Sequence, residues 1–159
     1  MQIDVKLINP FIQASMSVIQ TLTGKNLTVG KPEKNGTQLK SSDVLIQVGI
    51  VGELNGQVIL EISTDNAKKI ASTMMCGMPV ETLDEMACSA ISELGNMIMG
   101  NAATVFSVAD ILIDITPPIL VNGGNVSVHS TATSIKIPLL MDGQEYIRLN
   151  ILVNAGRTK

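Results

Sequence analysis

Aromatic residues are almost absent from this sequence of 159 residues. It has no Trp, one Tyr and two Phe, so aromatic side chains make up only 2% of the chain. Proteins that bind single-stranded nucleic acid stack bases on aromatic side chains, and this chain offers almost none. Positive charge is scarce as well, because 11 Lys and Arg stand against 14 Asp and Glu, which gives a net charge of −3. We therefore predict that the chain does not bind nucleic acid.

Histidine and cysteine are also scarce, which limits the chemistry of any active site. The sequence has one histidine, His129, and two cysteines, Cys76 and Cys88. These three residues cannot form a zinc site alone, and a Ser or Cys triad would need His129, near which no nucleophile motif occurs. We predict no metal site and interpret His129 as a surface strand residue. The two cysteines follow no spacing motif, which indicates reduced thiols, and we expect both to be small core residues.

Phosphate-binding glycine motifs and long apolar runs are missing too. The sequence has neither a Walker A motif nor a dinucleotide-binding motif. No apolar run reaches the roughly 18 residues of a membrane span, and residues 1–6 lack the apolar core of a signal peptide. We therefore expect a cytoplasmic chain that binds no membrane and carries no cofactor of its own.

Apolar residues nevertheless make up 45% of the chain, enough for a sizeable core. The length suits one domain, and no linker or low-complexity stretch interrupts it, so we expect a single domain over residues 1–159. Helices are predicted at residues 10–23, 65–76 and 83–109. Strands are predicted at residues 26–33, 43–54, 57–62, 111–116, 125–139 and 145–153, with a polar loop at 34–42.

Capping and turn residues define most of these bounds. Helix starts are predicted from Asn9-Pro10, from Ser63 or Thr64, and from a capping box at Thr82–Glu85. Gly24 is predicted to end the first helix, and Asn55-Gly56 and Asp142-Gly143 are predicted as hairpin turns. Helices and strands do not alternate strictly, so we predict an α+β fold in which long helices pack on an antiparallel-rich β-sheet.

The predicted helix at residues 83–109 has an unusually narrow polar face. On a helical wheel with about 100° per residue, one sector holds only small, polar or acidic residues, namely Glu85, Ser89, Glu93, Asn96, Gly100, Ala103 and Ser107. A surface helix normally has a broad polar face, so we expect this helix to be buried except along one line. Glu93 and Asn96 are neighbours on that line, with Ser89 one turn before and Gly100 one turn after. Taken alone, such a pair usually marks a solvated surface, although the small neighbours would also let another molecule approach.

The run from Ser89 to Thr104, SAISELGNMIMGNAAT, is more specific than this spacing. It resembles the signature of the CheC/CheX/FliY family of chemotaxis phosphatases: Asp or Ser, three residues, Glu, two residues, Asn and, about twenty residues later, a proline. Pro117 or Pro118 can supply that proline. The predicted first helix has no Glu-x-x-Asn, so the chain carries one motif, as the single-domain members of the family do.

The resemblance implies a CheC-like fold, a homodimer formed through the sheets, and hydrolysis of the aspartyl phosphate of a CheY-type response regulator. Asn96 would orient the attacking water, and Glu93 would pair with the regulator's phosphate-binding lysine. Ser89 and Gly100 would contact the regulator. Phosphoryl transfer depends mainly on positioning and charge stabilisation, and the Mg²⁺ would belong to the phosphorylated receiver domain rather than to this chain.

Two other interpretations remain open at this point. A chain of the same fold could be a non-catalytic adaptor, as flagellar switch proteins are, and would then work through protein contacts alone. A small-molecule sensor is the third interpretation, and it requires a pocket behind the long helix. Asn101 lies well round the wheel from Asn96, and we interpret it as a structural residue at a helix–helix contact.

Overall fold

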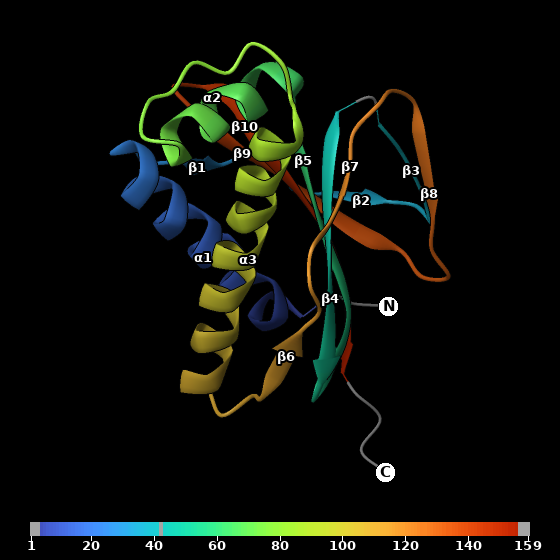
Figure 1. The fold of residues 1–159 in the computed structure, drawn as a ribbon. Helices are drawn as coiled ribbons and strands as arrows, with labels where there is room; N and C mark the ends of the chain where they lie inside the picture. Colours follow the sequence, from blue (N-terminus) through green and yellow to red (C-terminus); the bar gives the residue numbers. More distant parts are fainter. Residues whose placement is uncertain (1–3, 42, 156–159) are drawn as a thin grey trace.

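Three helices lie on one face of a large antiparallel sheet, and a two-stranded ribbon covers part of the other face (Figure 1). The computed structural model describes residues 4–41 and 43–155. Its helices are α1 (Val5–Thr23), α2 (Thr64–Met74) and α3 (Glu85–Val108). Its strands are β1 (Thr28–Val29), β2 (Glu33–Asn35), β3 (Gln38–Ser41), β4 (Val44–Gly52), β5 (Leu54–Ile62), β6 (Ile113–Ile115), β7 (Ile119–Val121), β8 (Val126–His129), β9 (Ser134–Met141) and β10 (Gln144–Ala155). The α+β prediction is confirmed.

The large sheet is built around two long hairpins. Its strand order is β1-β9-β10-β5-β4-β6, with β2 also on β9 and β7 also on β4. In the first hairpin Val44 pairs with Ile62, and β10 pairs in turn with β5 and β9. Every pairing in the described residues is antiparallel. Antiparallel neighbours need only short connections. The helices α1, before the strands, and α2 and α3, between β5 and β6, are therefore free to cover one face of the sheet.

The main core fills the space between the helices and the sheet. Along β4, alternate residues point toward the helices and are at most 2% exposed, namely Val44, Ile46, Val48 and Ile50. Phe11 of α1 and Phe106 of α3 meet edge to face, with ring centroids 5.2 Å apart. Burying each such side chain contributes about 1.5–3 kcal/mol, so this core holds α3 firmly against β4.

A second, smaller core lies under the β3–β8 ribbon, where Leu39, Leu45 and Ile59 pack together. Beside it the buried carboxylate of Glu61 accepts hydrogen bonds from Arg148 Nη1 at 2.9 Å and from Asn150 Nδ2 at 2.5 Å. A buried charge is stable only when it is paired and hydrogen-bonded, and these contacts satisfy that need. They lie on the face of the sheet away from the helices.

Two helix starts differ from the sequence prediction. Helix α1 begins at Val5, where the side chain of Asp4 caps it by accepting a hydrogen bond from Lys6 N, so Asn9-Pro10 lies inside the helix. The missing N–H of Pro10 removes one helical hydrogen bond, and burial of the ring in the core compensates. Helix α3 is capped by Asp84, not by Thr82, because the Asp84 carboxylate accepts from Ala87 N at 2.9 Å. The Ser63 cap and the Gly24 end, with φ 72°, are confirmed.

The predicted turn at Asn55-Gly56 is wrong. Ile50 pairs with Gly56, so the hairpin turns at Glu53, and Gly56 lies within β5. A Cβ on Gly56 would lie 1.9 Å from the carbonyl oxygen of Leu152 on the neighbouring strand, so the glycine serves a close approach of two strands. The Asp142-Gly143 turn is confirmed, with φ 52° and 78° at the two residues, as a type I′ turn requires.

The polar loop predicted at residues 34–42 is also wrong. It contains the end of β2 and the whole of β3, which pair with β9 and β8; Ser42 lies outside the described residues. The single strand predicted at residues 125–139 is two strands, β8 and β9, which belong to different sheets. The strands β2, β3 and β8 are defined by partners that lie far away in the sequence, whereas β9 also pairs with β10 across a short turn.

Candidate functional site

Helix α3 buries one face, as the wheel predicted, but its exposed side is wider than the predicted line, because Met86, Asn101, Thr104 and Val108 are exposed as well. Its inner face is formed by apolar residues that are at most 1% exposed: Ala87, Ile91, Leu94, Ile98, Met99, Ala102 and Phe106. Helices α1 and α2 flank it, and β4 runs beside it (Figure 1) and contacts it. These residues pack into one solid core with β4, so the described part of the chain leaves no room behind this helix for the ligand of a small-molecule sensor.

The outer line of α3 carries the polar residues singled out in the sequence. Ser89 and Glu93 are exposed, and Asn96 and Gly100 are half-buried. Because Glu93 and Asn96 are three residues apart in one helix, their side chains are neighbours. Within the described residues, neither side chain has a hydrogen-bond partner and Glu93 forms no ion pair. The carboxylate and the amide are therefore both available to an incoming molecule.

The surface around this pair is shallow and built from small residues. Nothing lies within 4 Å of the place where a Cβ on Gly100 would be, so this part of the line is open. A groove between α1 and α3 borders it, lined by Ser17, Val18, Thr21, Met97, Gly100, Asn101 and Thr104. Such a surface suits contact with another protein better than capture of a small molecule, which needs a deep apolar pocket.

Beneath the line, Gly95 is buried and faces the sheet. A Cβ at this position would lie 2.7 Å from Cγ2 of Ile46 and 3.8 Å from Cβ of Pro118. Of the two prolines considered in the sequence, Pro118 is thus the one that reaches the motif helix at this position. The role of Ile46 could not be found from the sequence, since it comes from β4. The signal that was visible is Gly95 itself, because glycine is unfavourable inside a helix.

The chain also matches known proteins. The profile of the family described as "Chemotaxis phosphatase CheX" matches residues 44–140. A relative from Thermotoga maritima, "CheY-P phosphatase CheX", is 32% identical and the match covers 96% of this chain and 99% of the relative. The chain belongs to the CheX family of chemotaxis phosphatases.

Solved CheX structures have the same fold. The chemotaxis protein CheX from Desulfovibrio desulfuricans superposes with a TM-score of 0.81 at 22% identity, over 94% of this chain and 99% of that one. CheX in the CheX–CheY–BeF₃–Mg²⁺ complex from Borrelia burgdorferi superposes with a TM-score of 0.73 at 25% identity, over 96% and 99% of the two chains. The CheX fold therefore extends over nearly the whole chain.

The cysteines and the histidine lie outside the candidate site. Cys76 is exposed, so the prediction that it is a core residue is wrong, and Cys88 is half-buried near the start of α3. Burial raises the pKa of the Cys88 thiol, and the Asp84 carboxylate raises it further, which makes the thiol less reactive. His129 is exposed on β8, as predicted.

Asn101 has a different environment from Asn96. It is exposed and lines the groove between α1 and α3, at a helix–helix contact as predicted, and no hydrogen bond joins its side chain to another described residue. In the described part of the chain, no group of three or more His, Cys, Asp or Glu side chains could hold a metal ion. None of the described helices is both long and apolar enough to cross a membrane.

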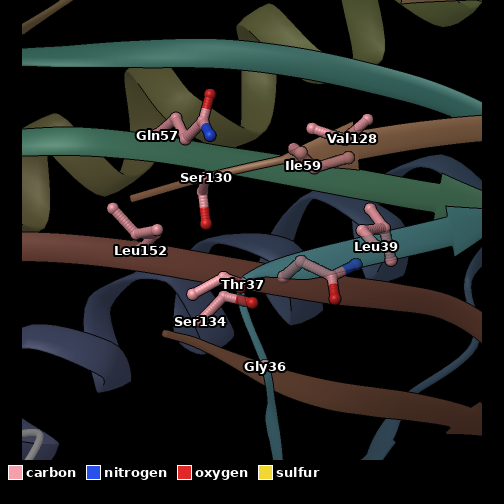
Figure 2. A pocket seen from close by; sticks show the side chains of 10 residues that line it. Gly36, Thr37, Leu39, Gln57, Ile59, Val128, Ser130, Ser134 and Leu152 are labelled. Atoms are coloured by element: carbon pink, nitrogen blue, oxygen red, sulfur yellow. The ribbon is translucent and has the colours of Figure 1, made fainter. Parts of the chain in front are cut away.

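Figure 2 shows a second hollow, on the face of the sheet away from α3. It lies between the β3–β8 ribbon and the sheet, where Leu39 and Val128 face Gln57, Ile59 and Leu152. Its volume is about 20 Å³, which is room for about one water molecule. A hollow of this size cannot hold a metabolite, so it is no alternative to the surface of α3.

Proposed function

We propose that this chain hydrolyses the aspartyl phosphate of a CheY-type receiver domain. The observation that carries the proposal is the pair Glu93 and Asn96, neighbours without a partner among the described residues, on the exposed side of a helix whose opposite face is buried in the core. Membership of the CheX family supports it, since the relative from Thermotoga maritima is named a CheY-P phosphatase. The complex from Borrelia burgdorferi supports a CheY-type partner, because it holds CheX and CheY together.

In this proposal Asn96 holds the attacking water. An amide can donate and accept hydrogen bonds at once, so it can keep a water molecule in line with the phosphorus atom. The water oxygen forms a new bond to phosphorus while the bond from phosphorus to the aspartate oxygen breaks. The products are inorganic phosphate, which carries away the protons of the water, and the free aspartate carboxylate. No covalent intermediate on this chain is needed.

Glu93 has a docking role in the same proposal. Its exposed carboxylate pairs with the lysine that binds the phosphoryl group in the receiver and so fixes the relative position of the two proteins. Ser89 and Gly100 leave room on either side, which allows the receiver's backbone to come close to α3. The Mg²⁺ is part of the receiver, and it supplies charge stabilisation at the phosphoryl group.

The first test is the rate at which a phosphorylated CheY-type receiver loses its phosphate. Wild type should accelerate the loss, and Asn96→Ala should abolish the acceleration because the water is no longer held. Glu93→Ala should weaken binding of the receiver and raise KM. Thermal melting of both variants should match wild type, since both side chains lie on the surface line.

The control is Ser107→Ala, which shortens another exposed polar side chain of α3, about three turns beyond Asn96. This variant should keep wild-type activity. If wild type does not accelerate phosphate loss from any receiver of its host, the proposal is wrong and the line on α3 is a docking face of an adaptor. The cytoplasmic location stays a prediction.

A further inference from the structure

Helix α3 comes close to the sheet at Gly95, the residue before Asn96. Ordinary contacts between carbon atoms are about 3.5–4.0 Å, whereas a Cβ on Gly95 would lie 2.7 Å from Cγ2 of Ile46. Ile46 cannot easily give way, because it is fully buried on a strand between two paired neighbours and its β-branched side chain is stiff. The contact therefore has room for glycine alone.

The second glycine of α3 has the opposite environment. Glycine is among the least favourable residues in a helix interior, so each of the two needs a reason. At Gly100 the absent side chain leaves the outer surface open, since nothing lies within 4 Å of a Cβ there. At Gly95 the absent side chain brings the inner face of the helix down onto Ile46 and Pro118.

We infer that the contact of Gly95 with Ile46 and Pro118 positions Asn96 for the hydrolysis, by fixing how far α3 stands from the sheet. This inference rests on the role of Asn96 in the proposed function. Asn96 follows Gly95 directly, so any outward movement of the helix at Gly95 carries the amide of Asn96 with it. Gly95, Ile46 and Pro118 are positioning residues, because they act on the reaction only through Asn96.

The size of the effect follows from the distances. To lengthen the 2.7 Å distance to that of an ordinary carbon–carbon contact, the helix has to move outward by roughly 1 Å. A displacement of about 1 Å in a group that orients a reactant can lower the rate on the order of 100-fold. The receiver contacts Ser89, Glu93 and Gly100, which lie on several turns of α3. Binding of the receiver therefore depends less on the position of any one turn. The contact should therefore affect kcat much more than KM.

The experiment uses a compensating substitution. Gly95→Ala adds the clashing methyl group, and Ile46→Ala in the same chain removes the Cγ2 atom that it would meet. We expect kcat on a phosphorylated CheY-type receiver to fall roughly 10- to 100-fold in Gly95→Ala, with KM within about twofold of wild type. If Gly95→Ala lowers kcat 100-fold, the Gly95→Ala/Ile46→Ala variant should have a kcat at least tenfold higher than that of Gly95→Ala.

The matched control is Gly95→Ala combined with Ile50→Ala. Ile50 lies on the same face of β4 and is also buried, so this variant loses an equal side chain from the same core and keeps the clash. It should not recover kcat. Equal recovery by the two double variants would overturn the inference, as would a Gly95→Ala enzyme with wild-type kcat. If Gly95→Ala does not fold alone, the comparison of the two double variants decides.

A readout other than activity separates this inference from the proposed function. In ¹⁵N-labelled protein, the side-chain amide signal of Asn96 should shift in Gly95→Ala and return toward its wild-type position when Ile46→Ala is added, but not when Ile50→Ala is added. An inactive wild type would overturn the proposed function, and the Asn96 signal would then decide the positioning by itself. An Asn96 signal that does not move in Gly95→Ala would overturn the positioning even in an active enzyme.

Discussion

At the scale of single residues, the candidate site depends on which polar side chains of α3 are exposed and on how small their neighbours are. Glu93 and Asn96 have no partner among the described residues, and their neighbours on the line are small. This part could be predicted from the sequence, because helical spacing alone places Ser89, Glu93, Asn96 and Gly100 together. The support beneath Asn96 could not, since Ile46 lies far away in the chain and no local pattern connects it with Gly95.

At the scale of single residues we also predict that replacing Gly100 weakens binding of the receiver but raises the stability of the protein. Gly100→Arg should weaken binding of a beryllofluoride-loaded receiver at least about tenfold, or 1.4 kcal/mol, because the long side chain fills the open part of the line. The free energy of unfolding should rise by up to about 1 kcal/mol, because arginine favours helix over glycine. Titration calorimetry and thermal melting measure the two effects.

Ser107→Arg is the control for Gly100→Arg. It adds the same charge to an exposed residue of the same line, nearly two turns closer to the end of α3. Binding of the receiver should stay within about twofold of wild type. Equal weakening by the two variants would attribute the effect to charge, and Gly100 would then have no particular place in the docking surface.

At the scale of elements, local signals predicted the helices and the β9–β10 turn, and long-range pairing decided the rest. Asp142-Gly143 turns the chain because both residues adopt positive φ. Asn55-Gly56 has the same kind of sequence, yet Gly56 is needed for the close approach of β10. The strands β2 and β3 are short and polar, and their partners lie about a hundred residues later. No periodicity in a window of ten residues can reveal such strands.

The β3–β8 ribbon should open independently of the rest of the fold. Leu39→Ala removes a central side chain of the small core under the ribbon, and such a truncation costs about 2–5 kcal/mol. We expect faster amide exchange in residues 38–41 and 126–129, unchanged protection in α3, and unchanged phosphatase activity. Hydrogen exchange followed by mass spectrometry measures this.

Leu94→Ala is the comparison for Leu39→Ala, because Leu94 is fully buried in the main core behind α3. This variant should lower the melting temperature of the whole domain and weaken protection in α3. If Leu39→Ala also exposed α3 to exchange, the ribbon and the main core would form one cooperative unit.

At the scale of the whole molecule, helices and ribbon occupy opposite faces of one sheet, so the proposed site and the ribbon are remote from each other (Figure 1). The resemblance implied a homodimer formed through the sheets, and the long strands predicted at residues 125–139 and 145–153 would invite such pairing if one of them had an unprotected edge. The structure changes that argument, since β10 is an inner strand between β5 and β9. Among the described strands, the ribbon strand β8 has β3 as its one neighbour and so keeps an edge to which another strand could add.

We predict a homodimer, formed on the sheet side and leaving α3 free for a receiver. Light scattering at micromolar concentration should give twice the chain mass of 16.9 kDa. The Gly100→Arg variant should give the same value, because its added side chain projects from the opposite face. A wild-type monomer at this concentration would contradict the prediction.

The burial of one whole face of α3 has a consequence for the use of this helix outside its protein. Residues 85–108 include two glycines and a long series of apolar side chains that the core covers. Short isolated helices are marginal in water even with good helix formers, so a peptide with this sequence would neither hold its shape nor stay dissolved. A designed scaffold that is to carry the Glu93 and Asn96 pair in this geometry therefore has to include the sheet as well as the helix.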